Sequence, residues 1–202
     1  MAEKQYLKST YGIETSDEIR NHYDEWSQSY DRELKEHGYV TPQRCARALK
    51  SVGTPSNSLI LDFGCGTGIS GAAFHEEGFR NLIGCDVSSE MLRLATGKGL
   101  YQKTFVIEPG AKVEGSYDVV AAVGVIGVGA APPEAFDIVM QILKPGGRFL
   151  FSYNDKALSD PRFTAKLTEH VKKGASLIFE EHGDHIPGIG LFSTVYVLQA
   201  PL

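Results

Sequence analysis

Three glycines and an acid lie together in one short segment of the chain. The segment LDFGCGTG, residues 61–68, places Gly64, Gly66 and Gly68 directly after an apolar run that contains Asp62. Glycines in a turn between a strand and a helix let a ligand approach the main chain, and the N–H groups at the helix start give it a weakly positive end. The segment therefore predicts a site for a nucleotide-type ligand.

The spacing of the glycines narrows the class of ligand. They read G-x-G-x-G, whereas the dinucleotide fingerprint G-x-G-x-x-G would need glycine at position 69, where Ile69 stands. No Lys-Ser or Lys-Thr pair follows the glycines, so a phosphate-binding P-loop is excluded. The G-x-G-x-G spacing therefore disfavours NAD and FAD as ligands.

A second acid, Asp86, closes the segment NLIGCD, 18 residues after Gly68. An acid at the end of the second strand of an α/β sheet can accept both hydroxyls of a ribose that carries no 2′-phosphate. The glycines and Asp86 together therefore predict an adenosine-type ligand. The simpler alternative is a tight turn followed by an acid that only caps the next helix.

Alternating strand and helix patterns surround these residues and are expected to position them. The apolar runs that predict strands are 58–63, 81–86, 103–108, 116–124 and 148–154. The helical patterns between them are 69–78, 88–97 and 132–143, and a further one follows at 162–173. Only a small helix or none is expected between 108 and 116. This alternation is typical of an open parallel sheet with helices on both faces.

The C-terminal part of the chain is expected to complete the sheet. Two β-like runs, 176–182 and 191–200, have no helical pattern between them and can pair antiparallel. The predicted fold class is therefore α/β, a Rossmann-like doubly wound sheet of seven strands in a three-layer α-β-α arrangement. Its strands are mostly parallel, with an antiparallel C-terminal strand.

Two helices are expected before the first strand. Thr15 and Glu18 have the spacing of a capping box and predict a helix over 16–34. Thr41, as N-cap before Pro42, predicts another that ends before Gly53. The large side chains along one stripe of the first helix are Ile19, Tyr23, Trp26 and Tyr30. Because aromatic faces attract cations and exclude water, this stripe is a candidate lid over a ligand, and the alternative is a helix packed by its apolar face.

Four segments in this order and spacing resemble the motifs of the class I S-adenosylmethionine-dependent methyltransferases. They are ILDFGCGTG, GCDVSSEML, SYDVV and ILKPGGRFLFS, within residues 58–153. YDEWSQSYD, GLY and VGVIGVG further resemble the small single-domain methyltransferases grouped with the Williams–Beuren-region methyltransferase-like protein. The resemblance implies one domain over 1–202, with N-terminal helices in 1–57, a cofactor-binding core in 58–153, and a helix and strand pair in 154–202.

The resemblance also implies a set of residues that bind S-adenosylmethionine, whose product is S-adenosylhomocysteine. These residues are Tyr23, Trp26, Tyr30, Asp62, Gly64, Cys65, Gly66, Thr67, Gly68, Asp86, Val87, Met91, Glu108, Val123 and Gly124. Gly64 and Gly66 would lie along the methionine portion, with Asp62 nearby to balance the ammonium and sulfonium charges. Asp86 would bind the ribose hydroxyls.

The remaining residues of the set would contact the adenine and the methyl group. Val87 and Met91 would flank the adenine face. Glu108 stands where the family often carries an Asp that accepts from the adenine amine, a departure from the family pattern. Val123 and Gly124 correspond to the positions that face the methyl group.

The implied activity is methyl transfer by in-line displacement to an unidentified small-molecule acceptor, which would enter between the N-terminal helix and residues 152–161. No catalytic residue is indicated, because a general base is needed only when the nucleophile carries a proton. The chain has no Asn/Asp-Pro-Pro-Tyr/Phe run, which lowers the weight of amide and exocyclic base nitrogens. A non-catalytic regulatory protein that binds the cofactor is the alternative. A short-chain dehydrogenase would need a Tyr-x-x-x-Lys pair that 132–144 lacks.

The segment EEHGDH, residues 180–185, places Glu180, Glu181, His182, Asp184 and His185 within six positions. Such a cluster could bind a metal, form an exposed charged edge strand, or contact a substrate through His182 or His185. The spacing favours the exposed edge strand over a metal site, and a substrate contact is also favoured over a metal. No metal is expected.

Composition sets the remaining expectations. A formal net charge of −5 without a Lys/Arg cluster makes nucleic acid an unfavoured partner. The longest apolar run, 119–131, is too short for a membrane-spanning helix, and the polar start of the chain predicts no export. Cys45, Cys65 and Cys85 lack paired spacing and suit reduced thiols in the cytoplasm. Oligomeric state does not follow from these features.

Overall fold

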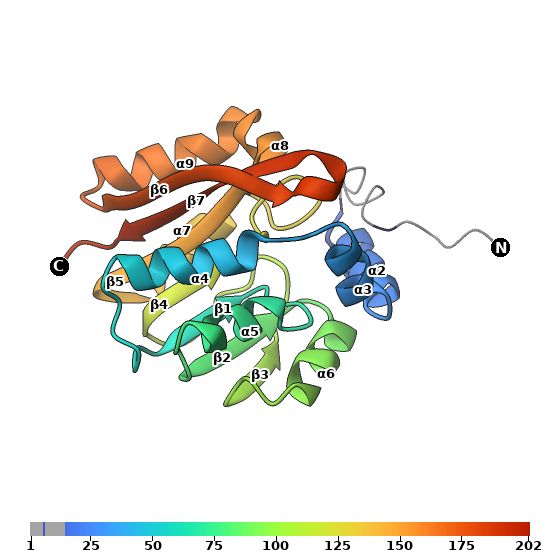
Figure 1. Ribbon diagram of the computed structural model, residues 1–202. Coiled ribbons are helices and arrows are strands. Elements are labelled where there is room, and N and C mark those ends of the chain that lie inside the picture. The colour runs from blue at the N-terminus through green and yellow to red at the C-terminus, as the bar shows by residue number, and fades with distance from the viewer. Residues whose placement is uncertain (1–5, 7–14) are drawn as a thin grey trace.

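A computed structural model describes Tyr6 and residues 15–202 of the chain. A sheet of seven strands in the order β3-β2-β1-β4-β5-β7-β6 runs through the described part (Figure 1). The strands are β1 (Ile60–Phe63), β2 (Leu82–Asp86), β3 (Lys103–Val106), β4 (Tyr117–Ala122), β5 (Leu143–Asn154), β6 (Ser176–Ile186) and β7 (Leu191–Gln199). Strands β1 to β5 pair in parallel, and β7 is antiparallel to both β5 and β6. The predicted α/β fold class is confirmed.

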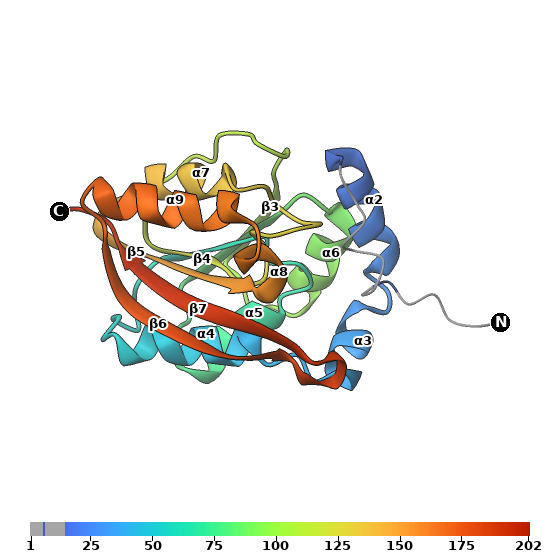
Figure 2. The ribbon, with the colours of Figure 1, turned by 90° about the horizontal axis from the view of Figure 1, so that it is seen from above.

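Helices cover both faces of this sheet. They are α2 (Ser16–Trp26), α3 (Tyr30–Glu36), α4 (Thr41–Ser51), α5 (Ile69–Glu76), α6 (Ser89–Gly97), α7 (Ala135–Gln141), α8 (Asp155–Leu158) and α9 (Pro161–Lys172), with a 3-10 turn η2 (Pro187–Ile189). Figure 2 shows α7 and α9 on one side of the sheet and α4 on the other. Since parallel strands are then covered on both faces, they read as continuous apolar runs.

Strand β5 contributes to the core on both faces. Phe149, Phe151 and Tyr153 lie in the buried cluster that includes α7 and α9, whereas Leu150 lies in the cluster that includes α4 and α5. This alternation follows from the two-residue period of a strand. The two buried clusters hold the sheet rigidly, so the carboxyl ends of its strands can form a binding site.

The N-terminal helix differs from its prediction. The capping box of Thr15 and Glu18 is confirmed, but the helix expected over 16–34 is divided into α2 and α3 by residues 27–29. The hydroxyl of Ser27 donates to the carbonyl of Asp24 at 2.8 Å. Serine hydroxyls compete with backbone N–H groups for carbonyls in this way, which favours a break in the helix.

Other details of the prediction also differ from the structure. Thr41 is the first residue of α4 and Val40 is its N-cap, so the predicted N-cap role of Thr41 is wrong. Strand β5 begins at Leu143 rather than at 148, because Leu143 pairs with Tyr117 ahead of a register shift. The short helix α8 was not predicted. The described residues between β3 and β4 contain no helix, as expected.

Candidate functional site

Two adjoining cavities lie on the described chain, and the larger cavity, of about 470 Å³, lies at the carboxyl ends of β1, β2 and β4. Gly64 follows β1, Asp86 ends β2, and Val123 follows β4; all three line it. The order of the strands reverses between β1 and β4, and ligands of open α/β sheets bind at such a switch point. Tyr23 of α2 and Tyr30 of α3 complete the wall.

The structure brings ten of the fifteen predicted cofactor residues to this wall. They are Tyr23, Tyr30, Gly64, Gly66, Asp86, Val87, Met91, Glu108, Val123 and Gly124. The other five, Trp26, Asp62, Cys65, Thr67 and Gly68, do not line it. Cys65 and Thr67 are buried beneath the glycine turn. Contacts of all fifteen residues with a cofactor stay predictions.

Each glycine of the turn is required for a distinct reason. Gly64, Gly66 and Gly68 all have positive φ, at +71°, +53° and +88°. A Cβ at Gly64 would stand 2.5 Å from Cγ2 of Val125, so no side chain fits there. A Cβ at Gly66 would meet nothing within 4 Å, because that space belongs to the cavity. The bare backbone therefore leaves room for a ligand at Gly66.

Asp62 lies behind the turn, with its side chain only 1% exposed. Its Oδ2 accepts from the hydroxyls of Ser70 at 2.6 Å and Tyr101 at 2.7 Å. Its Oδ1 has no hydrogen-bond partner among the described residues. Burial raises the pKa of this carboxyl to about 6, although the two hydroxyls act to lower it. A cation bound near the turn would compensate this buried charge.

Asp86 presents its carboxylate to the larger cavity from the end of β2. The backbone N–H groups of Gly66 and Ser88 donate to Oδ2 and Oδ1 at 2.8 and 2.9 Å. Burial raises the pKa of Asp86, and these N–H groups counteract the increase. The carboxylate is thus fixed by the main chain, with further lone pairs left for hydroxyl donors.

Polar contacts fasten α2 and α3 over the carboxyl ends of the strands. The pairs are Arg20 with Glu108, Asp24 with Ser88, and Asp31 with both Thr67 and Lys98. The carboxylate of Glu108 contacts Arg20 at 2.5 Å, so the predicted adenine contact would have to share it with this guanidinium. The two helices therefore close the site from one side.

The aromatic stripe divides between packing and the cavity. The side chain of Trp26 is buried, and its Nε1–H donates to Oε2 of Glu33 at 2.7 Å. Tyr23 and Tyr30 line the larger cavity, and the ring of Tyr30 packs edge-on against Trp26 at 4.6 Å. The tryptophan therefore packs, as the packed-helix alternative expects, and the tyrosines line the cavity, where their role as a lid over a ligand stays a prediction.

A second cavity of about 60 Å³, the smaller cavity, adjoins the first. Both are lined by Tyr23, Tyr30, Gly124 and Ala130. The polar groups of the smaller cavity beyond these are Tyr39, Ser152, Asn154 and His185. The sequence predicted His185 as a possible substrate contact and placed the acceptor's entry beside residues 152–161, which include Ser152 and Asn154. Tyr39 was not predicted, because it belongs to none of the motifs.

Gly124 lies where the two cavities meet. Its N–H donates to the hydroxyl oxygen of Ser152 at 3.0 Å. A Cβ at this position would stand 2.5 Å from the hydroxyl oxygen of Tyr39, and φ is +71°. Only glycine fits this junction without displacing Tyr39.

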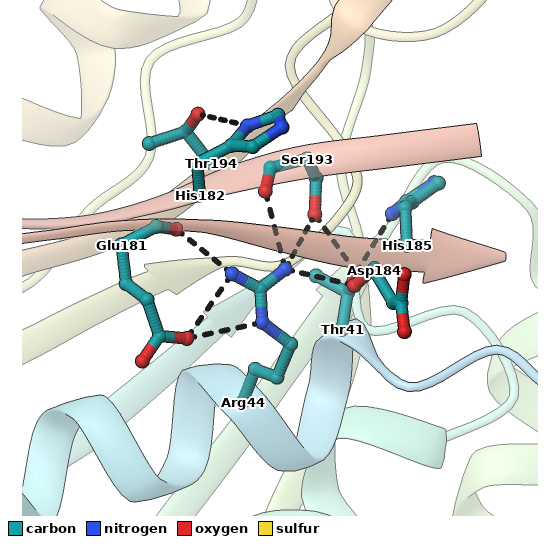
Figure 3. Close-up of polar contacts among 8 residues, drawn as sticks. All are labelled: Thr41, Arg44, Glu181, His182, Asp184, His185, Ser193 and Thr194. Atoms are coloured by element: carbon teal, nitrogen blue, oxygen red, sulfur yellow. Dashed lines mark hydrogen bonds and ion pairs between the residues drawn. The ribbon is translucent and has the colours of Figure 1, made fainter. Parts of the chain in front are cut away.

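The histidines of β6 have different surroundings (Figure 3). His182 lies 3.2 Å from the hydroxyl of Thr194 and lines neither cavity. The expected exposed, charged edge strand is confirmed, because β6 ends the sheet and Glu180, Glu181, His182 and Asp184 are exposed; His185 alone of these ionisable residues is buried. Within residues 15–202 and Tyr6, no group of three or more His, Cys, Asp or Glu is placed to hold a metal ion.

Comparison with known proteins places this site in a family. Residues 30–187 match the family described as a methyltransferase domain, and this range is more than half of the chain. The chain belongs to this family. The resemblance found in the sequence motifs is thereby confirmed, and the domain is that of an enzyme.

A related protein supports the same assignment. Methyltransferase-like protein 27 from Homo sapiens is 34% identical to this methyltransferase over 147 residues. The alignment covers 70% of this chain and 60% of the human protein. The chain therefore spans less than two thirds of that relative's length.

Solved structures share the fold of this methyltransferase. The cyclase SpnF covers 94% of this chain and 98% of its own with a TM-score of 0.73 and 13% identity. An S-adenosylmethionine-dependent methyltransferase from Thiobacillus denitrificans, in complex with S-adenosyl-L-homocysteine, covers 78% and 91% with a TM-score of 0.56 and 16% identity. At these identities the likeness shows the fold alone. No described helix is long and apolar enough to cross a membrane.

Proposed function

We propose that this methyltransferase binds S-adenosylmethionine in the larger cavity and transfers its methyl group to a small molecule in the smaller one. The observation that carries the proposal is the junction of the two cavities at Gly124, opposite the glycine turn and Asp86. The larger cavity falls within the roughly 300 to 1,000 Å³ typical of small-ligand sites. The cofactor would supply a methyl group that its sulfonium already activates.

The chain's own groups fit such a cofactor. The orphaned Oδ1 of Asp62 and the open space at Gly66 suit the cationic methionine portion. Asp86 has lone pairs available to accept ribose hydroxyls. Val87 and Met91 offer apolar surface to the adenine. These are the roles that the sequence motifs imply for them.

The contribution of the protein to the reaction would be positioning and exclusion of water. Methyl transfer is an in-line displacement, so the acceptor atom, the methyl carbon and the sulfur must be aligned. Gly124, at the junction of the two cavities, would determine how the acceptor atom, the methyl carbon and the sulfur are aligned. Helices α2 and α3, fastened to the core, would keep water out. The small volume beyond Gly124 favours a compact acceptor over a macromolecule.

Two further features belong to the proposal. The whole of 1–202 would act as one methyltransferase domain. A cytoplasmic location is supported by the three cysteines, Cys45, Cys65 and Cys85, which are all free thiols.

Thermal unfolding with and without ligand tests the proposal. S-adenosylmethionine and S-adenosylhomocysteine should raise the melting temperature, and NAD should not, because only ligands of the folded state stabilise it. Asp86→Ala should abolish the shift with the fold intact by circular dichroism, and Asp160→Ala, far from both cavities, should retain it. A shift with NAD alone, or an undiminished shift in Asp86→Ala, would contradict the proposal.

Product formation separates the enzyme from a regulatory protein with the same pocket. Release of S-adenosylhomocysteine in the presence of a metabolite pool is the expected result. Tight cofactor binding with no product from any pool would support the regulatory protein instead.

A further inference from the structure

His185 is the one imidazole that lines the smaller cavity. Its side chain is 6% exposed, and its Nδ1 lies 2.7 Å from the hydroxyl oxygen of Thr41 (Figure 3). Nε2 has no hydrogen-bond partner in the described part of the chain. The ring packs edge-on against Tyr39 at 5.2 Å, and the hydroxyl of Tyr39 reaches Gly124. A ring nitrogen that has no partner among the described residues and is not fully buried thus stands on a residue that lines the smaller cavity, next to the junction of the two cavities.

A chain of hydrogen bonds connects His185 to a fixed positive charge. Nη1 of Arg44 lies 3.1 Å from the hydroxyl oxygen of Ser193, which lies 3.1 Å from that of Thr41 (Figure 3). A guanidinium can only donate, so Ser193 accepts from Arg44. The hydroxyl proton of Ser193 then goes to Thr41, and the hydroxyl proton of Thr41 goes to Nδ1 of His185.

The opposite direction would leave a buried donor without an acceptor. If Nδ1 of His185 donated to Thr41 and Thr41 donated to Ser193, the hydroxyl proton of Ser193 would have no acceptor among the described residues. Ser193 is 0% exposed, so water cannot accept it either. A proton on Nε2 of His185 also has no acceptor among the described residues, but His185 lines the smaller cavity, where a ligand or water can accept it. His185 is therefore the neutral tautomer with its proton on Nε2.

Arg44 is held firmly enough to set this direction. Its Nη1 also donates to the carbonyl of Asp184 at 2.8 Å, and its Nη2 to the carbonyl and carboxylate of Glu181 at 2.8 and 3.1 Å. Burial and the Arg44 charge lower the pKa of His185 to about 4, so the ring stays neutral near pH 7. If the His185 ring were protonated, its positive charge would be repelled by the guanidinium of Arg44, to which the same series of hydrogen bonds connects it.

The other polar groups of the smaller cavity can also donate. Oδ1 of Asn154 accepts from the N–H of Ala157 at 3.0 Å, which leaves its NH₂ group as a donor. Ser152 accepts from Gly124, which leaves its hydroxyl proton to donate. No Asp, Glu, Lys or Arg of the described chain lines this cavity, and burial raises the pKa of Tyr30 well above its usual value. The site therefore offers donors and lacks a base.

We propose that the smaller cavity binds the methyl acceptor as a small carboxylate, with one oxygen accepting the Nε2–H of His185. An acceptor that must lose a proton would find no base here, whereas a carboxylate is already ionised at neutral pH. A volume of about 60 Å³ is several times the roughly 10 to 15 Å³ that a cavity needs to hold one water, and it adjoins the larger cavity, so there is room for a small carboxylate group. Methyl transfer to this carboxylate rests on the proposed function. Binding of the carboxylate rests on His185 alone.

In the reaction that this binding supports, no proton has to be removed from the acceptor. A lone pair of the second carboxylate oxygen forms the bond to the methyl carbon, while the carbon–sulfur bond breaks and its electron pair stays on sulfur. The products are a methyl ester and S-adenosylhomocysteine. His185 keeps its proton throughout and acts by orienting the carboxylate.

Nitrogen NMR of the histidine rings tests the tautomer directly. In the ligand-free full chain at pH 7, the His185 signals should show a protonated Nε2 and a bare Nδ1. Sodium butyrate should shift the Nε2 and Hε2 signals in a saturable way, and 1-butanol should not. A proton on Nδ1, or a response to the alcohol and not to butyrate, would overturn the proposal.

Matched variants test the contribution of the donor. His185→Phe keeps a ring and removes the donor, and should weaken butyrate binding at least tenfold. His185→Gln restores an N–H at the same reach and should recover most of it, while His182→Phe on the same strand should bind as the parent does. Equal butyrate affinity in His185→Phe would overturn the proposal. If that variant does not fold, the tautomer and titration of the unaltered protein still decide.

These measurements do not depend on cofactor binding. Failure of S-adenosylhomocysteine to bind would contradict the proposed function and leave the butyrate result standing. Cofactor binding with no butyrate response would contradict only the assignment of the acceptor.

Discussion

Asp62 is a buried carboxyl group whose ionisation opposes folding. Its pKa of about 6 in the folded chain exceeds the ordinary value of 3.8, so the folded state binds this proton more tightly than the unfolded state. The free energy of unfolding should therefore decrease as pH rises from 4 to 7. A shift of about two pKa units corresponds to about 3 kcal/mol.

Urea unfolding across this pH range measures the effect. Asp62→Asn cannot ionise, so the difference in unfolding free energy between the parent and this variant should change by about 2 kcal/mol between pH 4 and pH 7, most of the full effect. The constant cost of burying an amide does not alter that slope. Parallel curves for the two proteins would show that Asp62 titrates normally.

Single residues differed in how far the sequence could predict them. Gly64, Gly66 and Asp86 were identifiable because their roles depend on local spacing after a strand. Ser152 was included only in the broad acceptor segment 152–161. Tyr39 was not identifiable, because it precedes α4 and approaches Gly124 only through the packing of distant elements. The direction of the hydrogen bonds to His185 depends on contacts between α4 and β7, which no local pattern encodes.

At the scale of elements, α2 and α3 act together as a cover that polar contacts hold on the core. Asp31 of α3 contacts both Thr67 and Lys98, so Asp31→Ala removes two of the tethers at once. Exposed pairs contribute about 0 to 1 kcal/mol each to stability, so the melting temperature should change little. Dissociation of S-adenosylhomocysteine should accelerate about fivefold, equivalent to about 1 kcal/mol.

Stopped-flow displacement of the ligand measures this rate. Arg93→Ala, which breaks an exposed pair with Glu90 on α6, is the matched control and should leave the rate unchanged. Equal dissociation rates for Asp31→Ala and the parent would mean that the cover does not limit release.

The elements themselves were largely predictable, and the misses have physical causes. Apolar runs between helical patterns indicated the central strands β1, β2, β4 and β5, because buried parallel strands are apolar throughout. The last two strands were indicated by β-like runs with no helical pattern between them. The break between α2 and α3 was missed since the aromatic stripe keeps its helical spacing across Ser27 and Ser29. The start of β5 was missed because it depends on pairing with Tyr117 in another strand.

At the scale of the whole molecule, the two cores stabilise the fold and the sheet's carboxyl end carries the site, so stability and binding should be separable. Phe149 is fully buried, with its ring 4.8 Å from Phe136 and 4.6 Å from Phe151, and it lines neither cavity. Phe149→Ala should lower the free energy of unfolding by about 3 to 5 kcal/mol. Phe192→Ala, at a ring that is 41% exposed, should cost less than about 1 kcal/mol.

The affinity for S-adenosylhomocysteine should not decrease together with this stability. At a temperature where Phe149→Ala is still folded, its dissociation constant for S-adenosylhomocysteine by calorimetry should stay within about twofold of the parent, because the glycine turn and Asp86 are positioned by β1, β2 and the main-chain donors around them. A parallel loss of affinity would show that packing beneath β5 extends its influence to the glycine turn. The site would then depend on the whole sheet rather than on its switch point alone.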